Sequence, residues 1–249
     1  MRKQVARGGR RLARKARKQV ARRGRELAHS SVSRIHAGFH TGPRVTRYAM
    51  YARLSRFRCT ECEGKKVLSI SNSKRLCGVL GFSDDQILDT RYPEYNLLEL
   101  PFPDDNFDYV VSDQVLEHVE GNPQVAIDEA FRVLKPGGIG VHATCFVYPI
   151  HKSRFYGDYW RFTPEALALL AEKHASIIEA DGWGNPYVWI YGWLGLLYVP
   201  IPHLSWHPFH WLATKNVRRW PIATWIVAKK REKQSGGLGF DPLSRTDQG

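Results

Sequence analysis

An alternation of short apolar runs with helix-like segments, which begins at Lys65, is the feature that most constrains the fold. Each apolar run has the length of a strand. The expected strands are Val67–Ile70, Gln86–Leu88, Phe107–Val111, Ile139–Thr144 and Ile222–Val227. Strands that alternate with helices form mostly parallel sheets covered on both faces, so the pattern predicts an α/β fold. Ligands of such sheets bind beyond the carboxyl ends of the strands.

The expected helices between these strands have recognisable ends. The segment Pro123–Leu134 carries its apolar residues on one face, and a Lys-Pro-Gly-Gly sequence at residues 135–138 stops it. Thr163 stands before Pro164, an order favoured at a helix start because proline has no N–H to leave unpaired there. A shorter helix is expected over Ser73–Leu80.

Positive charge is concentrated at the N-terminus. The chain of 249 residues has a net charge of +13, and residues 1–28 hold twelve Lys and Arg side chains against Glu26 alone. The remaining residues carry 25 basic and 23 acidic groups, so the body of the chain is nearly neutral. We expect residues 1–30 to be a basic extension and residues 31–64 to be a helical segment that leads into the main domain.

Two interpretations of the basic extension stay open from its composition. A helix that forms on an anionic surface, such as the inner face of a membrane, fits its Ala, Arg and Lys content. A disordered solubilising tail fits equally well. Nucleic acid is a further, less favoured partner because the body of the chain is nearly neutral. The Arg-rich start also resembles an organelle transit peptide in composition.

The remaining composition favours a cytoplasmic protein, peripheral to the inner membrane if the extension binds there. Four cysteines in a chain of this length indicate a reducing compartment rather than a disulfide framework. No apolar segment of the signal-peptide kind follows the N-terminal charges. The longest uncharged stretch, between Asn185 and Lys215, is interrupted by four prolines and does not predict a transmembrane helix.

Three linked motifs across about 40 residues carry a family resemblance. They are Leu-Pro-Phe-Pro-Asp-Asp-Asn-Phe-Asp at residues 100–108, Val-Leu-Glu-His at 115–118 and Arg-Val-Leu-Lys-Pro-Gly-Gly at 132–138. In this order and spacing, the chain resembles class I S-adenosylmethionine-dependent methyltransferases of the type 11 group over roughly residues 65–230. The resemblance implies S-adenosylmethionine as cofactor and a Rossmann-like three-layer sandwich with a mostly parallel, seven-stranded sheet.

A second motif narrows the resemblance. The Asp-Tyr-Trp-Arg-Phe-Thr sequence at residues 158–163 is similar to a bacterial subgroup associated with glycan synthesis. It implies O-methylation of a saccharide or a lipid-linked glycan. We therefore expect a methyltransferase domain over 65–232, followed by a flexible tail at 233–249. Two alternatives are a non-catalytic binding protein of the same fold and a nucleic-acid methyltransferase guided by the basic extension.

The expected cofactor site follows from the three parts of the cofactor. Its carboxylate needs backbone amides or hydroxyls from the loop after the first strand, its ribose needs an acid at the end of the second strand, and its adenine needs flat neighbours. The resemblance places Asn96 near the adenine amine and Phe102 beside the ring. The full set of expected cofactor-binding residues is Ser69, Ser71, Asn72, Ser73, Asp89, Asn96, Leu100, Phe102, Asp113 and Gln114.

The first loop departs from the family pattern, because Ser69-Ile70-Ser71-Asn72-Ser73 stands where relatives carry a glycine-rich turn. Glycine permits positive φ and close approach of the backbone. Asn tolerates the left-handed region better than most residues, so we expect Asn72 to replace glycine at the bend. Lys74 or Arg75 could pair with the cofactor carboxylate. The loop leaves the non-catalytic alternative open.

A hydroxyl acceptor also needs a base within about 3 Å of its proton. The candidates follow the fourth and fifth expected strands: Asp113, His118 and His151. His118 could equally be a packed residue at a helix start. The expected substrate-binding residues are Asp158, Tyr159 and Arg161.

Two patterns that suggest metal sites are weak, and no metal is expected. Cys59 and Cys62 form only half of a zinc ribbon. His203, His207 and His210 have helical spacing, but Pro208 interrupts the helix that would align them. Seven of the eight tryptophans lie from Trp183 onward. They are consistent with a sugar-stacking wall, a membrane-facing surface or a C-terminal core cluster.

Overall fold

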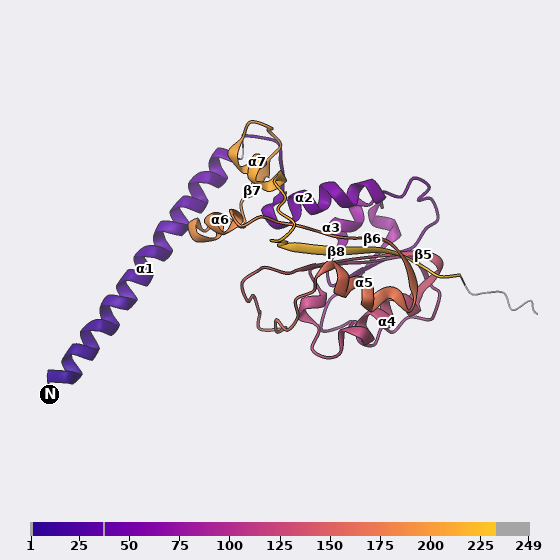
Figure 1. Ribbon diagram of the computed structural model, residues 1–249, viewed down its shortest axis with the longest axis horizontal. Coiled ribbons are helices and arrows are strands. Elements are labelled where there is room, and N and C mark those ends of the chain that lie inside the picture. The colour runs from indigo at the N-terminus through magenta and orange to yellow at the C-terminus, as the bar shows by residue number, and fades with distance from the viewer. Residues whose placement is uncertain (1, 37, 233–249) are drawn as a thin grey trace, which may run out of the picture.

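A computed structural model describes residues 2–36 and 38–232 (Figure 1). A six-stranded sheet organises this part of the chain, in the order β3-β2-β4-β5-β8-β6. Neighbours from β3 to β5 are parallel, whereas β8 runs antiparallel to both β5 and β6. The strands are β2 (Val67–Ile70), β3 (Ile87–Asp89), β4 (Phe107–Asp113), β5 (Leu134–Cys145), β6 (Ala175–Trp183) and β8 (Ala223–Lys230).

The sheet is the middle layer of three, which confirms the predicted α/β sandwich with a mostly parallel sheet. Two helices cover each face (Figure 1). They are α2 (Val45–Leu54) and α3 (Lys74–Val79) on one side, and α4 (Pro123–Val133) and α5 (Pro164–Glu172) on the other. The predicted strand number of seven is wrong for the main sheet of the described residues, which has six.

Strand alternation explains the two core clusters. Val67 packs into the cluster under α2 and α3, while its neighbour Leu68 packs into the cluster under α4 and α5. On β8, Trp225 likewise packs into the first of these clusters and Ile226 into the second. Because successive strand residues point to opposite faces, a strand that is apolar throughout buries both faces, as the short apolar runs predict.

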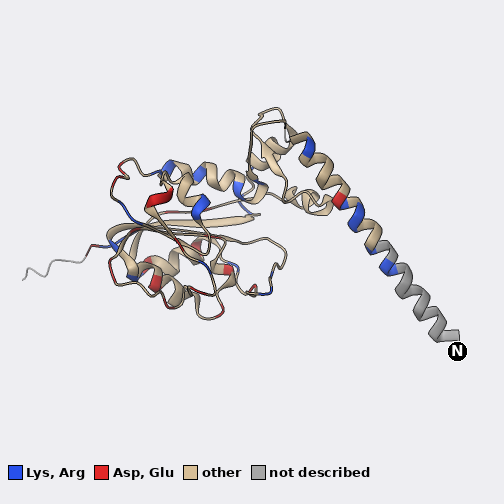
Figure 2. Cartoon of the chain, turned by 180° about the vertical axis from the view of Figure 1, so that it is seen from behind, with Lys and Arg blue, Asp and Glu red and all other residues tan. Residues whose placement is uncertain are grey.

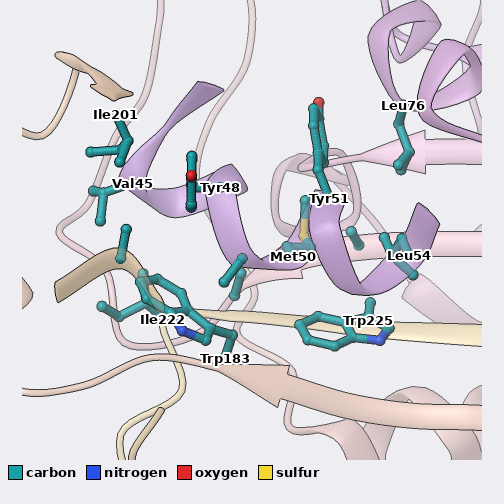
Figure 3. Packing of buried hydrophobic residues seen from close by; sticks show 14 of the residues in the cluster. Val45, Tyr48, Met50, Tyr51, Leu54, Leu76, Trp183, Ile201, Ile222 and Trp225 are labelled. Atoms are coloured by element: carbon teal, nitrogen blue, oxygen red, sulfur yellow. The ribbon is translucent and has the colours of Figure 1, made fainter. Parts of the chain in front are cut away.

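Helix α2 closes the core on its side of the sheet. Met50 and Leu54 are fully buried on its inner face and pack in one cluster with Trp183 and Trp225 (Figure 3). The indole Nε1–H of Trp225 donates to Glu179 Oε1 at 2.9 Å, so its polar edge is satisfied inside the apolar layer. The C-terminal tryptophans therefore include two core residues, while several others are exposed.

The predicted helix ends are confirmed, with one difference in the following strand. Thr163 caps α5 by accepting from the Ala166 N–H, and α4 begins at Pro123 and ends at Val133. Strand β5 begins directly at Leu134 rather than at Ile139. Gly137 adopts φ of +76° there, and the register shifts between Phe107 and Tyr109, so the Pro-Gly-Gly segment bends the start of the strand.

A second group of elements lies beyond the sheet (Figure 1). Helix α1 projects away from the domain and contacts α6 and β7, while β1 pairs antiparallel with β7. The group consists of α1 (Arg2–His36), β1 (Thr41–Arg44), α6 (Val188–Leu194), β7 (Pro200–Pro202) and α7 (Pro208–Thr214). Helix α1 is continuous past residue 30. The predicted flexible tail at 233–249 falls outside the described residues.

Three 3₁₀ turns complete the order of elements: Ser55–Phe57, Asp84–Gln86 and Leu116–His118. All four cysteines are free thiols. Among the helices of the described residues, none combines the length and the apolar character that a membrane crossing requires.

The packing of α2 gives a stability prediction with a matched control. Leu54→Ala should lower the free energy of unfolding by about 2–5 kcal/mol, because it opens a cavity between α2 and the sheet. Leu169→Ala removes the same atoms from a helical leucine that is 70% exposed, and should change stability by less than about 0.5 kcal/mol. Urea unfolding of both variants measures the difference. Equal losses would show that α2 does not close the core.

Candidate active site

A pocket of about 290 Å³ lies where β2, β3 and β4 end at the carboxyl edge of the sheet. This is the edge at which the sequence predicts ligand binding. Polar groups and aromatic rings share the walls. The lining includes Ser71, Asn72, Tyr95, Asn96, Gln114 and His118.

The turn after β2 forms the first wall. Ser71 and Asn72 have φ of 52° and 67°, so two consecutive residues lie in the left-handed region. Asn72 thus adopts the left-handed conformation expected of it at this bend. The Asn72 N–H donates to the carbonyl of Thr90 at 3.0 Å, which ties the turn to the residue after β3. The chain thus makes the tight turn without glycine, at the conformational cost that such residues carry.

The remaining predicted residues of this loop are buried behind the pocket. Ser69 Oγ donates to Asp89 Oδ1 at 2.5 Å, because the two residues are paired in register on β2 and β3. Ser73 Oγ donates to the Ile70 carbonyl at 2.6 Å and accepts from the Asp113 N–H at 2.7 Å. These serines position neighbouring strand ends rather than face the pocket. Lys74 pairs with Asp84 at 2.9 Å, on the other side of its helix.

An aromatic wall flanks the pocket, and its lining ring differs from the predicted one. Tyr95 lines the pocket, and Phe102 stacks behind it with ring centroids 5.8 Å apart and planes 9° from parallel. Asn96 lines the pocket as expected, but its Oδ1 accepts from the Leu98 N–H at 3.0 Å. Leu100 is a core residue of the α4 side. The ring that lines the pocket is Tyr95, which was not predicted, and the predicted Phe102 stands behind it.

Gln114 is the strongest sign that a polar ligand belongs here. It follows β4 with φ of +60°, in the left-handed region, and lines the pocket. Its side-chain Nε2 is buried and has no hydrogen-bond partner within the protein. A buried amide donor without a partner costs free energy, so it indicates a ligand that accepts its hydrogen bond.

Asp113, a predicted catalytic and cofactor-binding residue, lies under the pocket floor. Its side chain is 6% exposed and is paired with Arg47 Nε at 2.7 Å. The Tyr51 hydroxyl donates to the same oxygen, Oδ2, at 2.5 Å. Desolvation and the Asp113 charge raise the pKa of Tyr51 far above its usual value, so Tyr51 stays a donor. This arrangement assigns Asp113 to a buried ion pair with α2.

The two predicted histidines are in contact. The rings of His118 and His151 lie 4.8 Å apart, edge to face, and His118 lines the pocket whereas His151 stands behind it. Burial lowers the pKa of His118, and its Nδ1 lies 2.6 Å from the carbonyl of Gly157. His151 Nδ1 lies 3.2 Å from the Pro149 carbonyl and 3.3 Å from Asp158 Oδ2. These acceptors favour the tautomer that leaves His151 Nε2 free to accept a proton.

A buried carboxyl group that sequence reasoning missed lies beside this pair. Glu117 is fully buried, and its Oε2 accepts from Thr144 Oγ1 at 2.8 Å. Its Oε1 has no hydrogen-bond partner and lies 3.9 Å from His151 Nε2. Burial raises the pKa of Glu117 to about 7. The acid at the third position of Val-Leu-Glu-His was the available signal, because a glutamate in an otherwise apolar run is unusual.

The predicted substrate-binding residues hold the loop after β5 in shape. Asp158 is 1% exposed and accepts from the Arg161 guanidinium, with Oδ1 2.5 Å and Oδ2 2.8 Å from it. This ion pair holds the pKa of Asp158 at about 2. Tyr159 is exposed, and its N–H donates to the Glu117 carbonyl at 2.8 Å. The structure thus brings Asp158 to His151 but does not bring Tyr159 or Arg161 to the pocket wall.

One cluster in the described part of the chain has metal-ligating atoms within 4.8 Å of one another: Glu117, Cys145 and His151. The weak sequence patterns have other partners. Cys62 Sγ donates to the Cys59 carbonyl at 3.0 Å. The Nδ1 atoms of His203 and His210 both lie within hydrogen-bond distance of the Tyr48 hydroxyl, at 2.7 and 2.9 Å.

Comparison with known proteins gives the same region a family. Residues 57–141, which include β2, β3, β4 and most of β5, match the family model described as a methyltransferase domain. The similarity to a methyltransferase domain covers this segment of the chain. S-adenosylmethionine is the methyl donor that this domain implies, as the resemblance predicts.

Curated relatives match over short segments. The chain is 41% identical over 71 residues to the chloroplastic 2-methyl-6-phytyl-1,4-hydroquinone methyltransferase 2 of Oryza sativa subsp. japonica, covering 27% of this chain and 19% of that protein. It is 46% identical over 59 residues to a probable S-adenosylmethionine-dependent methyltransferase of Mycolicibacterium smegmatis, covering 22% and 23%. The matches thus span about a fifth of the length of these relatives.

Among solved structures, a complex of the Haloferax volcanii Trm112 methyltransferase activator with a putative methyltransferase aligns with 75% of this chain and 91% of the matched one. The identity is 17% and the TM-score is 0.48.

The buried Glu117 gives a pH prediction. The folded-state pKa of about 7 lies above the ordinary value of 4.5, so the folded protein binds a proton that the unfolded chain has lost. Stability should therefore fall between about pH 4.5 and 7, by on the order of 3 kcal/mol. Glu117→Gln keeps the neutral form and should remove this part of the pH dependence. Thr144, Cys145, His151 and Asp113 are the groups that face or act on the carboxyl.

Urea unfolding across this pH range, compared between wild type and Glu117→Gln, isolates the contribution of Glu117 from other titrating groups. Glu172→Gln, which neutralises an exposed glutamate on α5, serves as the matched control and should follow wild type. A constant difference between wild type and Glu117→Gln at every pH would show that Glu117 titrates normally.

Proposed function

We propose that the protein is an S-adenosylmethionine-dependent methyltransferase that O-methylates a saccharide or a lipid-linked glycan. The observation that carries the enzymatic part is the pocket at the carboxyl edge of β2, β3 and β4, most of whose lining residues belong to the segment 57–141 that matches a methyltransferase domain. The glycan part rests on the resemblance of residues 151–164 to a glycan-associated subgroup.

The residues around the pocket fit the cofactor. The left-handed turn at Ser71 and Asn72 replaces the glycine turn, and Gln114 Nε2 offers a buried donor without a partner. Asp89, oriented by Ser69, is the acid at the end of the second strand that would accept from the ribose hydroxyls. Tyr95, backed by Phe102, would flank the adenine. When bound, S-adenosylmethionine supplies the methyl group.

His151 is the proposed general base. Its Nδ1 is held by the Pro149 carbonyl and Asp158, so Nε2 can take the proton of an acceptor hydroxyl. Glu117 Oε1 lies 3.9 Å from the same nitrogen and, when ionised, would stabilise by its charge the imidazolium that forms. His118, in contact with His151 and facing the pocket, would separate the base from the cofactor and orient the acceptor.

A hydrophobic phenolic acceptor is a second candidate. The observation that favours it is the 41% identity over 71 residues to a protein named as a phytyl-hydroquinone methyltransferase. An acceptor of this kind and a lipid-linked glycan share one property, since an apolar tail would hold each of them in a membrane.

We further propose that residues 1–28 attach the enzyme to an anionic membrane surface, which places it in the cytoplasm at the inner membrane. In the described part of α1, Glu26 is the single acid and pairs with Arg22 at 2.8 Å, on a helix that projects from the domain (Figure 2). Each basic residue near an anionic leaflet contributes on the order of 1 kcal/mol, so several together suffice for reversible attachment.

Binding of S-adenosylhomocysteine tests the cofactor site. Wild type should bind it, and Asp89→Ala should weaken binding by about 1–3 kcal/mol, because the ribose hydroxyls lose a charged acceptor. Asp85→Ala, an exposed aspartate in the turn before β3, is the control and should bind as wild type does. Isothermal titration calorimetry gives all three affinities. Undetectable binding by folded wild type at millimolar ligand would favour the non-catalytic alternative.

Turnover tests the base. His151→Ala should lower turnover by ~10²–10⁴ and leave S-adenosylhomocysteine affinity unchanged, because proton removal is lost while the pocket remains. The assay uses the acceptor that wild type methylates best among glycans, lipid-linked saccharides and quinols. His174→Ala is the control, since His174 also has an aspartate partner but lies at the end of α5. Wild-type turnover in His151→Ala would remove His151 from the mechanism.

A further inference from the structure

The group of elements beyond the sheet has a distinct surface composition. We define the acid-poor lobe as α1 together with residues 38–44 and 184–221. These ranges hold seventeen Lys and Arg residues, and Glu26 is their one acidic residue. Along the backbone of the sheet domain, by contrast, acidic and basic residues are interspersed (Figure 2). The lobe therefore carries its net positive charge without the interspersed acids of an ordinary protein surface.

Large apolar side chains are exposed on the same lobe. Trp193 is 87% exposed and Trp206 is 72% exposed, far more than a packed aromatic residue would be. Within residues 184–221 the other half-exposed or exposed apolar residues are Tyr187, Ile190, Leu194, Tyr198, Trp211 and Trp220. Contiguous exposed aromatic residues on a soluble surface mark an interaction site, whereas scattered single ones do not.

Helix α6 organises part of this surface. Ile190, Trp193 and Leu194 have the three- and four-residue spacing of one helix face, and all three are exposed. Val188 and Tyr191 are buried on the opposite face. Helix α6 is thus apolar on both sides, and its outer face has no cover in the described chain. Helix α6 contacts the basic helix α1, because Gly195, which follows the last turn of α6, lies beside the side chain of Arg25. The apolar face of α6 therefore borders α1.

Cations are interleaved with the aromatic rings. Lys215 Nζ lies 4.9 Å from the ring of Tyr187 and 4.8 Å from the ring of Trp211, so it joins the start of α6 to α7. The Arg44 guanidinium lies 5.2 Å from the ring of Tyr198. Tryptophan, tyrosine and basic residues together are the side chains that settle at a membrane interface, where rings reach the acyl boundary and cations reach the phosphates.

We infer that the acid-poor lobe is a docking face for an anionic lipid bilayer, with the outer face of α6 inserted among the headgroups and α1 lying along the charged surface. Charge complementarity selects this occupant: a bilayer rich in anionic lipid repels acids everywhere on the contact, and the lobe has only one. A protein partner would not require that acidic residues be absent from two chain segments that lie far apart in sequence. The inference adds α6 to the attachment proposed for residues 1–28 and rests on that proposed function.

The docking face is also close to the proposed base. Trp189 of α6 lies 6.3 Å from the ring of Tyr148, and Tyr148 lies 5.0 Å from the ring of His151. A path of adjacent rings therefore runs from the lobe to the acceptor side of the pocket. This placement favours an amphiphilic acceptor, whose tail stays in the bilayer while its hydroxyl group reaches His151.

Sedimentation of the full chain with vesicles tests the inference. The vesicles contain phosphatidylcholine and phosphatidylglycerol in a ratio of roughly three to one, and binding is measured at low salt and at salt high enough to screen α1. A variant with Ile190→Ser, Trp193→Ser and Leu194→Ser should bind at least about tenfold more weakly than wild type at high salt, where the inserted apolar face carries the attachment. The matched control, Leu88→Ser, Leu169→Ser and Ile178→Ser, removes three exposed apolar side chains from the sheet domain and should bind as wild type does.

The outcomes separate this inference from the proposed activity. Equal binding by the α6 variant and wild type would overturn the docking face, as would binding to an RNA oligonucleotide without binding to vesicles. A wild-type dimer that the α6 variant converts to a monomer, with vesicle binding unchanged, would assign the face to a second copy of the chain and also overturn it. S-adenosylhomocysteine binding is measured on the same samples. Its absence in wild type would contradict the proposed activity alone, and its retention in both variants shows that they are folded.

Discussion

The pocket depends on the interactions of the buried carboxylate of Asp113. It stands at the end of β4 and joins three segments: Arg47 and Tyr51 come from α2, and Ser73 of the β2 loop accepts from its backbone N–H. Removal of one partner from a buried ion pair typically costs 3–5 kcal/mol, because the other charge stays uncompensated. The pair therefore fixes α2 against the carboxyl edge of the sheet. Gln114, the next residue in the chain, follows this ion pair in a left-handed conformation.

Some polar groups of the site face the pocket, and others are buried behind it. Asp113, Ser69 and Ser73 form a buried layer that positions strand ends, and Asn72, Gln114 and His118 form the layer that faces the pocket. A second buried layer, made by Glu117, Thr144 and Asp158, supports His151 from behind. Side chains held in this way keep their geometry before a ligand arrives, which is what positioning of reactants requires.

Sequence patterns predicted the parts of this molecule that local physics determines. Apolar runs such as Phe107–Val111 form strands because both faces of the central sheet are buried. Asn72 occupies the bend because asparagine tolerates positive φ better than most residues. Strand β6 was not predicted, and its Glu179 and Asp181 find their partners Trp225 and Arg53 only in the folded protein. Residues that only tertiary contact brings to the site, such as Arg47, Tyr95 and Glu117, gave no signal of comparable strength. Asp158 and Arg161 were recognised as important but belong to the ion pair that shapes the loop, which a motif alone does not distinguish from substrate binding.

The uneven distribution of charge connects the two ends of the molecule. The sheet domain has acidic and basic residues in near balance, some of them in ion pairs such as Asp158 with Arg161, so its net charge is small. Among the lobe side chains that the structure describes, Arg22 forms a salt bridge, with Glu26, the one acid of the lobe, so the net positive charge of the lobe acts outward. An enzyme docked on an anionic surface, as we propose for this one, would need no strong attraction between the pocket and the acceptor, because the surface would concentrate both. Tyr148 contacts both Trp189 of the acid-poor lobe and His151 of the candidate active site, so it links the two.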